Sequence, residues 1–213
     1  IRHAITVAHQ RGLKVMLKPH VDLRNDDDWR GNIRPDDLNA WFASYRDFIG
    51  HFADLATSLG VEELSVGTEL VGVSGQTDHW RGVIGDVRQR YAGPLTYAAN
   101  YDEYQGVQFW DALDFIGVDA YFELYSTPTA DVASLVASWQ PIERNLAAFS
   151  ARWSRPILFT EAGYASQVGT ATAPWNWLIS TVPAPAEQAA GYEALFRTFW
   201  DDPWFAGVHW WMW

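Results

Sequence analysis

The chain alternates between helical and strand-like runs, and this alternation constrains its fold more than any other feature. Apolar residues recur every three or four positions over 38–55, and weaker or shorter helical runs cover 4–8, 78–91, 132–149 and 186–200, with a bend or restart expected at Pro141. Six apolar runs between them are strand candidates: 13–18, 63–67, 95–99, 115–120, 157–160 and 206–211. Several lack alternation, which is typical of parallel strands covered by helices.

Such a pattern admits a doubly wound sheet or a (β/α)8 barrel. Turns that enter the strands are short, such as Gly93-Pro94, whereas the loops 20–37 and 162–185 that leave them are long. This asymmetry is typical of a barrel that carries its chemistry at the C-terminal strand ends. No glycine-rich phosphate loop follows a strand, which weakens the nucleotide-binding alternative. We therefore predict an α/β fold of the (β/α)8 TIM-barrel type.

The length indicates that this barrel is incomplete. A complete barrel needs about 250 residues, whereas this chain has 213 residues and six strand candidates. We expect one partial domain over 1–213 that lacks the first two strands and the last helix. The chain begins at Ile1 without a signal-peptide pattern. Because a signal peptide could have been lost with the front, both a secreted and a cytoplasmic location stay open.

Composition excludes several classes of partner. The 26 acidic against 15 basic residues give a net charge of −11, which argues against nucleic acid and anionic membrane surfaces as partners. No apolar run reaches the ~18 residues of a membrane-spanning helix. The absence of cysteine excludes a disulfide scaffold and a thiolate zinc site. The 13 tryptophans are more than a core of this size ordinarily uses, so some are expected to have another role.

Two glutamates occupy equivalent positions, each after a threonine at the end of an apolar strand, in Gly-Thr-Glu at 67–69 and Phe-Thr-Glu at 159–161. A carboxylate at such a strand end is costly unless it is paired or catalytic. Since parallel barrel strands converge, Glu69 and Glu161 are expected to face each other across the barrel mouth. Two facing carboxylates suit glycosidic bond cleavage, in which one protonates the leaving oxygen and the other attacks the anomeric carbon. The alternative is a structural role for either glutamate.

Four segments resemble the signature segments of glycoside hydrolase family 113: Leu-Lys-Pro-His-Val at 17–21, Ser-Val-Gly-Thr-Glu-Leu at 65–70, Gly-Val-Asp-Ala-Tyr-Phe at 117–122 and Leu-Phe-Thr-Glu-Ala-Gly-Tyr at 158–164. The resemblance runs from the third to the eighth barrel strand, and the order of the segments makes the combination specific. It implies a retaining (β/α)8 enzyme of clan A, in a family whose characterised activity is mainly endo-β-1,4-mannanase. The partial domain would then be a glycoside hydrolase catalytic domain.

Carried over onto this chain, the resemblance implies that Glu69 is the general acid/base and Glu161 the nucleophile. Many clan A families place asparagine before the acid/base, where it contacts the sugar 2-hydroxyl, whereas Thr68 stands there in this chain. Asn100, at the next strand end, could make that contact instead. Tyr121 could donate a hydrogen bond to Glu161 and hold its carboxylate ionised and oriented.

Other polar residues near strand ends have structural interpretations beside the functional one. His20 and Asp22 could contact sugar hydroxyls or lie in a surface loop. Asp119 is expected to cap its strand end by hydrogen bonds. The acidic run 26–28 lacks the spacing of ligands and glycine of a calcium loop and is predicted to be solvated. The histidine-rich strand ends of metal-dependent barrel hydrolases are absent, so we expect no metal and no other cofactor.

The tryptophans divide into packing residues and candidate sugar platforms. Three have apolar helical spacing and are expected to pack: Trp41, Trp139 and Trp200. Trp175 and Trp177 lie in the long loop after Glu161 and serve no helical pattern. Pyranose rings stack their C–H faces on aromatic rings, so both are predicted to bind substrate. The resemblance also implies a tryptophan beneath the reacting sugar at the eighth strand end, which is Trp211 or, in another register, Trp213.

The sequence favours a retaining, monomeric glycoside hydrolase that acts on β-mannan or a related β-1,4-linked oligo- or polysaccharide without a cofactor. Three alternatives stay open. The chain could be a non-catalytic carbohydrate-binding barrel, an exo-acting β-glycosidase of the same clan, or a metal-dependent barrel hydrolase with metal at His20.

Overall fold

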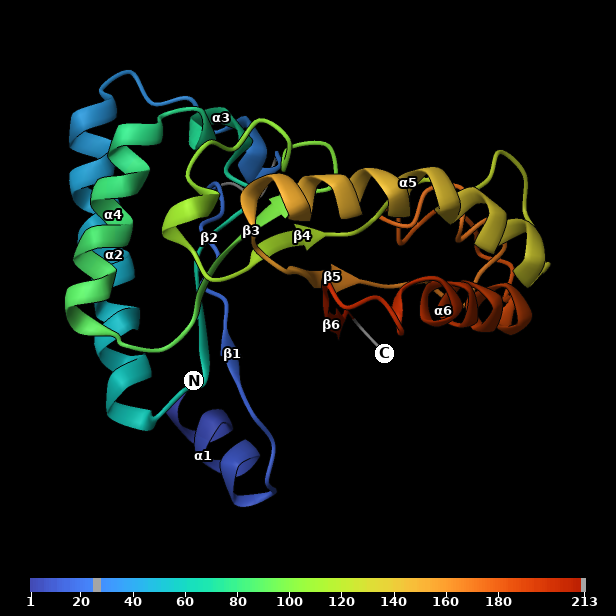
Figure 1. The fold of residues 1–213 in the computed structure, drawn as a ribbon, viewed down its shortest axis with the longest axis horizontal. Coiled ribbons are helices and arrows are strands. Elements are labelled where there is room, and N and C mark those ends of the chain that lie inside the picture. The colour runs from blue at the N-terminus through green and yellow to red at the C-terminus, as the bar shows by residue number, and fades with distance from the viewer. Residues whose placement is uncertain (25–27, 212–213) are drawn as a thin grey trace. The chain divides into compact units, whose positions relative to one another are not determined.

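The computed structural model describes residues 1–24 and 28–211 (Figure 1). The chain forms two compact units, Ile1–Gly117 and Val118–Trp213. The assignment of 1–213 to one domain stays a prediction.

The first unit contains three complete strands and the start of a fourth. Its elements are α1 (Arg2–Gln10), β1 (Met16–Leu17), η1 (Arg30–Asn32), α2 (Leu38–Leu59), β2 (Glu63–Thr68), α3 (Val71–Ser74), α4 (Thr77–Arg90), β3 (Leu95–Asn100), η2 (Trp110–Ala112) and the beginning of β4 (Ile116–Asp119). β2 lies between β1 and β3 and pairs in parallel with both, with Leu64 opposite Leu17 on one side and Leu95 on the other.

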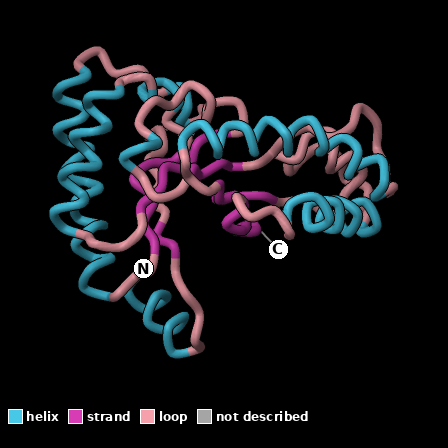
Figure 2. Tube along the Cα trace, in the orientation of Figure 1, coloured by secondary structure: helices cyan, strands magenta, loops and turns pink. Residues whose placement is uncertain are grey.

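Local sequence explains the bounds of α2. The Asp37 carboxylate accepts a hydrogen bond from the Ala40 N–H at 3.0 Å and caps the start of the helix. Gly60, with φ of +64°, ends it in the left-handed conformation that glycine adopts without steric cost. α2 lies beside α4 (Figure 2). Phe42 of α2 contacts Trp80 of α4 with ring centroids 5.6 Å apart, so aromatic packing joins the two helices.

The second unit contains the end of β4, α5 (Val132–Trp153), β5 (Ile157–Ala162), α6 (Pro185–Phe199) and β6 (Phe205–Trp210). β5 and β6 are parallel neighbours, and α5 lies beside α6. The core between helices and strands is aromatic. Trp139 of α5 contacts Phe199 of α6 at 5.0 Å between ring centroids, and Phe199 in turn contacts Phe159 of β5 at 5.1 Å.

Most of the predicted elements are present, with one correction. α5 is a single 22-residue helix through Pro141, so the helix does not restart there, and the bend stays a prediction. Trp200 was expected to pack, but α6 ends at Phe199 and the Trp200 side chain is 65% exposed. Trp139 is fully buried as predicted, and Trp41 stacks on Tyr45.

Within each unit, neighbouring strands follow the order of the chain: β1, β2 and β3 in the first, and β5 and β6 in the second. Successive parallel strands joined by helices in chain order are the repeating units of a (β/α)8 barrel, whereas a doubly wound sheet reverses its strand order at a switch point. No described helix is both long and apolar enough to cross a membrane.

Candidate active site

Glu69 follows β2 directly and has an unusual backbone. Its φ is +50°, in the left-handed region that residues other than glycine rarely adopt. Just before it, Ser65 pairs with Thr96 and Thr68 with Ala98, so three steps along β2 match two along β3. One extra residue is therefore inserted into β2 as a bulge, a feature that re-aims side chains at sheet ends. The bulge brings the chain out of the strand at Glu69.

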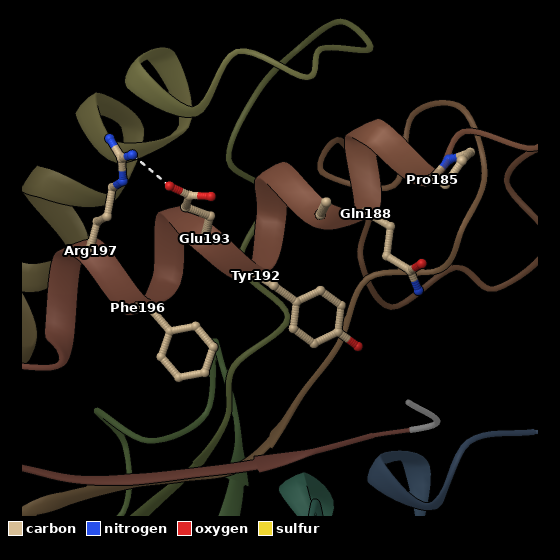
Figure 3. A pocket seen from close by; sticks show the side chains of 7 residues that line it. Pro185, Gln188, Tyr192, Glu193, Phe196 and Arg197 are labelled. Atoms are coloured by element: carbon tan, nitrogen blue, oxygen red, sulfur yellow. Dashed lines mark hydrogen bonds and ion pairs between the residues drawn. The ribbon is translucent and has the colours of Figure 1, made fainter.

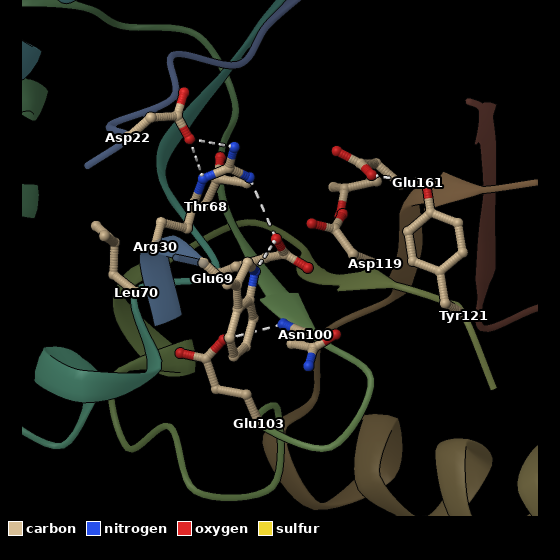
Figure 4. A network of polar contacts seen from close by, with 12 residues as sticks. Asp22, Arg30, Thr68, Glu69, Leu70, Asn100, Glu103, Asp119, Tyr121 and Glu161 are labelled. Carbon is tan, nitrogen blue, oxygen red and sulfur yellow. Dashed lines mark hydrogen bonds and ion pairs between the residues drawn. The ribbon is translucent and has the colours of Figure 1, made fainter. Parts of the chain in front are cut away.

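The Glu69 side chain is held by two residues of the loop after β1. Its Oε2 accepts hydrogen bonds from Trp29 Nε1 at 3.0 Å and from an Arg30 guanidinium nitrogen at 3.2 Å. Arg30 also donates to Asp22 Oδ1 at 2.6 Å, so one guanidinium joins two carboxylates (Figure 4). The Glu69 side chain is 12% exposed, while that of Asp22 faces solvent. Asp22 is thus an ion-pair partner of Arg30.

Sequence reasoning missed Trp29 and Arg30, although the loop that contains them was recognised as long. Trp29 packs closely on the backbone of this loop, because a Cβ placed on Gly31 would lie 2.1 Å from a carbon of its indole ring. Only glycine at position 31 leaves room for the ring in this place. A tryptophan and an arginine near a glycine, in a long loop after a barrel strand, are the signal that could have identified both.

Asn100 is the last residue of β3, as the predicted strand end requires. Its side-chain nitrogen donates to Asp102 Oδ1 at 2.8 Å, and its backbone N–H donates to Glu103 Oε2 at 2.9 Å. Glu103 is a buried carboxyl that sequence reasoning did not single out. The proposed contact of Asn100 with a sugar 2-hydroxyl stays a prediction.

His20 lies beside α2. It lines a cavity of about 230 Å³ whose other walls include Trp41, Ser44, Tyr45 and Phe48 of that helix. Its expected contact with sugar hydroxyls stays a prediction. Within the described part of the chain, no cluster of three or more histidine, aspartate and glutamate side chains has the arrangement of a metal site. Of the acidic run 26–28, only Asp28 lies among the described residues.

In the second unit, Glu161 lies on β5 and is 8% exposed. The Tyr121 hydroxyl donates a hydrogen bond to Glu161 Oε2 at 2.8 Å, the contact expected from the sequence (Figure 4). β5 carries an extra residue here as well, because Phe159 pairs with Val208 and Ala162 with Trp210. Both glutamates therefore follow or occupy a bulge. The two glutamates thus share a neighbouring bulge, although only Glu69 has a left-handed backbone.

Asp119, the last residue of β4, is completely buried. Its Oδ1 accepts a hydrogen bond from the Thr160 hydroxyl at 2.7 Å, and the Ala120 N–H donates to the Glu161 carbonyl at 2.7 Å. These contacts join the end of β4 to Thr160 and to the backbone of Glu161. The hydrogen-bonded role expected for Asp119 at its strand end is thus present.

Two aromatic residues of the predicted platforms, Trp177 and Trp211, lie near the end of β5. A Cβ on Gly163 would lie 3.1 Å from the Trp177 ring and 2.7 Å from the Trp211 carbonyl oxygen, so both residues closely approach the backbone after Glu161. Trp175 is 50% exposed. Trp213 lies outside the described residues.

The register of β6 bears on the choice of Trp211. The Trp210 ring packs on Tyr192 and Phe196 of α6, with centroid distances of 4.3 and 5.4 Å. β6 ends at Trp210, and the predicted role of Trp211 beneath the reacting sugar stays a prediction. The backbone N–H of Trp211 donates a hydrogen bond to the Ala162 carbonyl at 2.8 Å, which continues the hydrogen bonding between β6 and β5.

A groove of about 740 Å³ runs along α6 (Figure 3). Its walls are formed by Pro185, Gln188, Ala189, Tyr192, Glu193, Phe196 and Arg197. Among the described residues, none of the site residues predicted from the sequence lines this groove, so it is not assigned to the candidate active site.

Comparisons with known proteins agree with the resemblance found in the sequence. The sequence profile of Glycoside Hydrolase Family 113 matches residues 1–213. The solved structure of the family 113 β-mannanase AaManA from Alicyclobacillus acidocaldarius, in complex with ManMIm, has 34% sequence identity and a TM-score of 0.88, and the match covers 100% of this chain and 66% of that one. A complex of a family 113 β-1,4-mannanase has 30% identity and a TM-score of 0.87, with 99% and 66% covered.

More distant structures share the fold alone. A β-glucuronidase from an uncultured Clostridium sp. has 16% identity and a TM-score of 0.72, and the match covers 98% of this chain and 35% of that one. No curated protein sequence matches the chain. The chain spans 66% of the length of the two mannanase structures, and its close match to them confirms the predicted fold class, a partial (β/α)8 barrel.

Proposed function

Because the chain belongs to glycoside hydrolase family 113, we propose that the protein hydrolyses β-1,4-linked mannan or a related β-glycan by double displacement with retention of configuration. The observation that carries the proposal is the family match over residues 1–213 together with two glutamates at strand ends, Glu69 after β2 and Glu161 on β5.

In the first step, the Glu161 carboxylate attacks the anomeric carbon of the sugar. A bond forms between its oxygen and C1, the bond between C1 and the glycosidic oxygen breaks, and the leaving oxygen takes a proton from the Glu69 carboxyl group. The hydrogen bond from Tyr121 to Oε2 supports the nucleophile role, since it fixes the carboxylate and stabilises its charge before attack.

In the second step, water attacks C1 while Glu69 takes a proton from the water, and the bond between C1 and Glu161 breaks. The contacts of Glu69 suit this alternation between acid and base. Arg30 stabilises the ionised carboxylate that receives the proton, and Trp29 fixes Oε2 by a second hydrogen bond. Retention requires the two carboxyl groups to be ~5–5.5 Å apart, which a crystal structure of the full-length protein would measure.

The substrate class rests on the mannanases of the family and on the exposed aromatic residues. Of the structures similar to this chain, the one with 34% identity is a family 113 β-mannanase and one with 30% identity is a family 113 β-1,4-mannanase. Trp175, Trp177 and Trp211 provide flat surfaces on which the C–H faces of successive sugar rings could stack. The sugar hydroxyls would then take polar partners, for which Asn100 and His20 are candidates. Neither step requires a metal or an organic cofactor.

The decisive experiment measures release of reducing ends from mannan and manno-oligosaccharides by the full-length protein and two alanine variants. Glu161→Ala and Glu69→Ala are each expected to lower the rate by about 10³-fold or more. Azide added to Glu161→Ala should yield a glycosyl azide of inverted configuration. Glu193→Ala is the matched control, since the Glu193 side chain is exposed on α6 and pairs with Arg197 of the same helix. A rate within tenfold of the parent for either site variant would show that the assigned roles are wrong.

A further inference from the structure

A buried carboxyl group lies close to Glu69 but takes no part in the proposed reaction. Glu103 is 6% exposed, and its two oxygens accept hydrogen bonds from the Tyr97 hydroxyl at 2.7 Å and from the Asn100 N–H at 2.9 Å. Burial raises the pKa of Glu103 to about 7, against the lowering effect of these hydrogen bonds. A group that is costly to bury calls for an explanation.

The direction of the hydrogen bonds links Glu103 to the catalytic strand end. A tyrosine hydroxyl has one hydrogen, and that of Tyr97 is donated to Glu103. The phenolic oxygen is thereby left as an acceptor, and it accepts the Leu70 N–H at 2.9 Å. Glu103 thus determines that Tyr97 presents an acceptor to Leu70. The three groups form a chain from carboxylate to phenol to backbone.

Leu70 contributes the peptide N–H that immediately follows Glu69. The N–H of Glu69 itself donates to the Ala98 carbonyl at 2.8 Å. Both peptide groups that flank the Glu69 α-carbon are therefore bound to β3, one by its backbone and one by the Tyr97 side chain. A left-handed conformation at a glutamate costs free energy and persists only where its surroundings fix it. These two hydrogen bonds are such a constraint.

Tyr97 is itself held rigidly by packing. Its ring is completely buried and lies 5.2 Å from Trp80, 5.5 Å from Phe109 and 6.2 Å from Trp110, centroid to centroid. A Cβ on Gly67 would lie 2.8 Å from this ring, so the bulge of β2 also rests on it. The hydroxyl therefore has little freedom to follow Leu70 if the backbone at Glu69 relaxes.

We propose that Tyr97 and Glu103 are positioning residues for the general acid/base, which hold Glu69 in its left-handed conformation through the Leu70 N–H. This inference rests on the proposed role of Glu69. It predicts a defect specific to proton transfer, because the nucleophile Glu161 lies on a different strand. A merely structural role in the core would instead lower all steps alike.

The test compares leaving groups in the full-length protein. Phenyl β-mannobioside needs protonation of its leaving oxygen, whereas the 2,4-dinitrophenyl compound leaves as a stable anion without it. Tyr97→Phe, which removes only the hydroxyl, is expected to lower kcat/KM by about 10- to 100-fold on the phenyl substrate and by less than about threefold on the dinitrophenyl substrate. Glu103→Gln should show the same selectivity and provides a second variant should Tyr97→Phe not fold.

Tyr45→Phe is the matched control. Tyr45 is also buried, and its hydroxyl donates to the β2 backbone at the Val66 carbonyl, 2.8 Å away. Its loss should show no selectivity between the two leaving groups. Equal losses on both substrates in Tyr97→Phe and Glu103→Gln, or no loss in either, would overturn the positioning role.

The Glu69→Ala variant distinguishes failure of the positioning role from failure of the proposed function. Of all the variants, it should show the largest difference in kcat/KM loss between the phenyl and the dinitrophenyl substrate. If Glu69→Ala shows selectivity and the positioning variants do not, only the further inference fails. If Glu69→Ala shows none, or the parent cleaves neither substrate, the proposed function and the inference fail together.

Discussion

The hydroxyl of Tyr121 donates a hydrogen bond to Oε2 of Glu161 at 2.8 Å, and both side chains are nearly buried. A carboxylate so enclosed needs a donor to stabilise its charge, and the phenol provides one from the end of β4. The same bond restricts rotation of the carboxylate about its last torsion. The other oxygen is thereby directed for attack in the proposed first step.

Tyr121→Phe is expected to lower kcat on manno-oligosaccharides by about 10- to 100-fold, because the nucleophile loses a charge-assisted hydrogen bond worth about 1.5–3 kcal/mol. KM should change much less. Steady-state kinetics of the purified full-length enzyme measure both. Tyr125→Phe, at an exposed position in the same loop, is the control and should match the parent. A kcat unchanged in Tyr121→Phe would contradict the role of this bond.

Arg30→Met is expected to slow hydrolysis of the glycosyl-enzyme, because Glu69 loses the cation that stabilises its ionised form and the link to Asp22. With 2,4-dinitrophenyl β-mannobioside, whose first step is fast, kcat should fall by about tenfold. Methionine retains the unbranched stem of the side chain. Arg81→Met removes an exposed ion pair with Asp111 and should have no such effect. Equal rates for both variants would show that Arg30 is only structural.

The positions of the two glutamates could be predicted, because an apolar run that ends in Thr-Glu marks a strand end in either case. The direction of their side chains could not. In a regular strand Glu161 would point to the same face as Phe159, whose ring packs on Phe199 of α6. The extra residue in β5 breaks this alternation, and Glu161 meets Tyr121 instead. Nothing in the residue pattern marks such a bulge.

The hydrogen-bond partners of Glu69 could not be predicted for a different reason. Trp29 and Arg30 lie in a loop without periodicity, and in such a loop the spacing of residues does not indicate which side chains contact the site. The roles of Tyr97, in β3, and Glu103, in the turn after it, could not be predicted from the sequence either. Tyr97 is part of the apolar run of β3, so its buried ring was expected, whereas the contact of its hydroxyl with Leu70 depends on the bulge in β2.

Trp177→Ala is expected to raise KM for manno-oligosaccharides by about tenfold with a smaller change in kcat, since loss of one stacked aromatic ring removes about 1–1.5 kcal/mol of binding. The ring lies against Gly163, two residues beyond Glu161, and is therefore close to the nucleophile strand. Trp200→Ala, at the exposed end of α6, is the control. An unchanged KM in Trp177→Ala would remove Trp177 from the predicted substrate platform.

Glu63, the first residue of β2, should make stability depend on pH. Burial, and secondly the charge of Asp114, raise the pKa of Glu63 from 4.5 to about 7. Between these values the folded protein binds a proton that the unfolded chain releases, so the free energy of unfolding falls as pH rises through this window. At pH 8 the folded protein carries a buried charge, whereas below pH 4.5 Glu63 is neutral in both states.

Glu63→Gln removes this charge and is expected to increase the free energy of unfolding at pH 8 by about 1–2 kcal/mol, with little effect at pH 4. Urea unfolding of the parent and the variant at both pH values measures the difference. The neighbouring Glu62 provides a control of opposite sign, because the Val15 N–H and His9 lower its pKa. Its contribution to stability is present above its unfolded pKa, so Glu62→Gln should be less stable than the parent at pH 8. A Glu63→Gln variant that is destabilised at pH 8 as well would show that the Glu63 side chain stabilises the fold in its charged form.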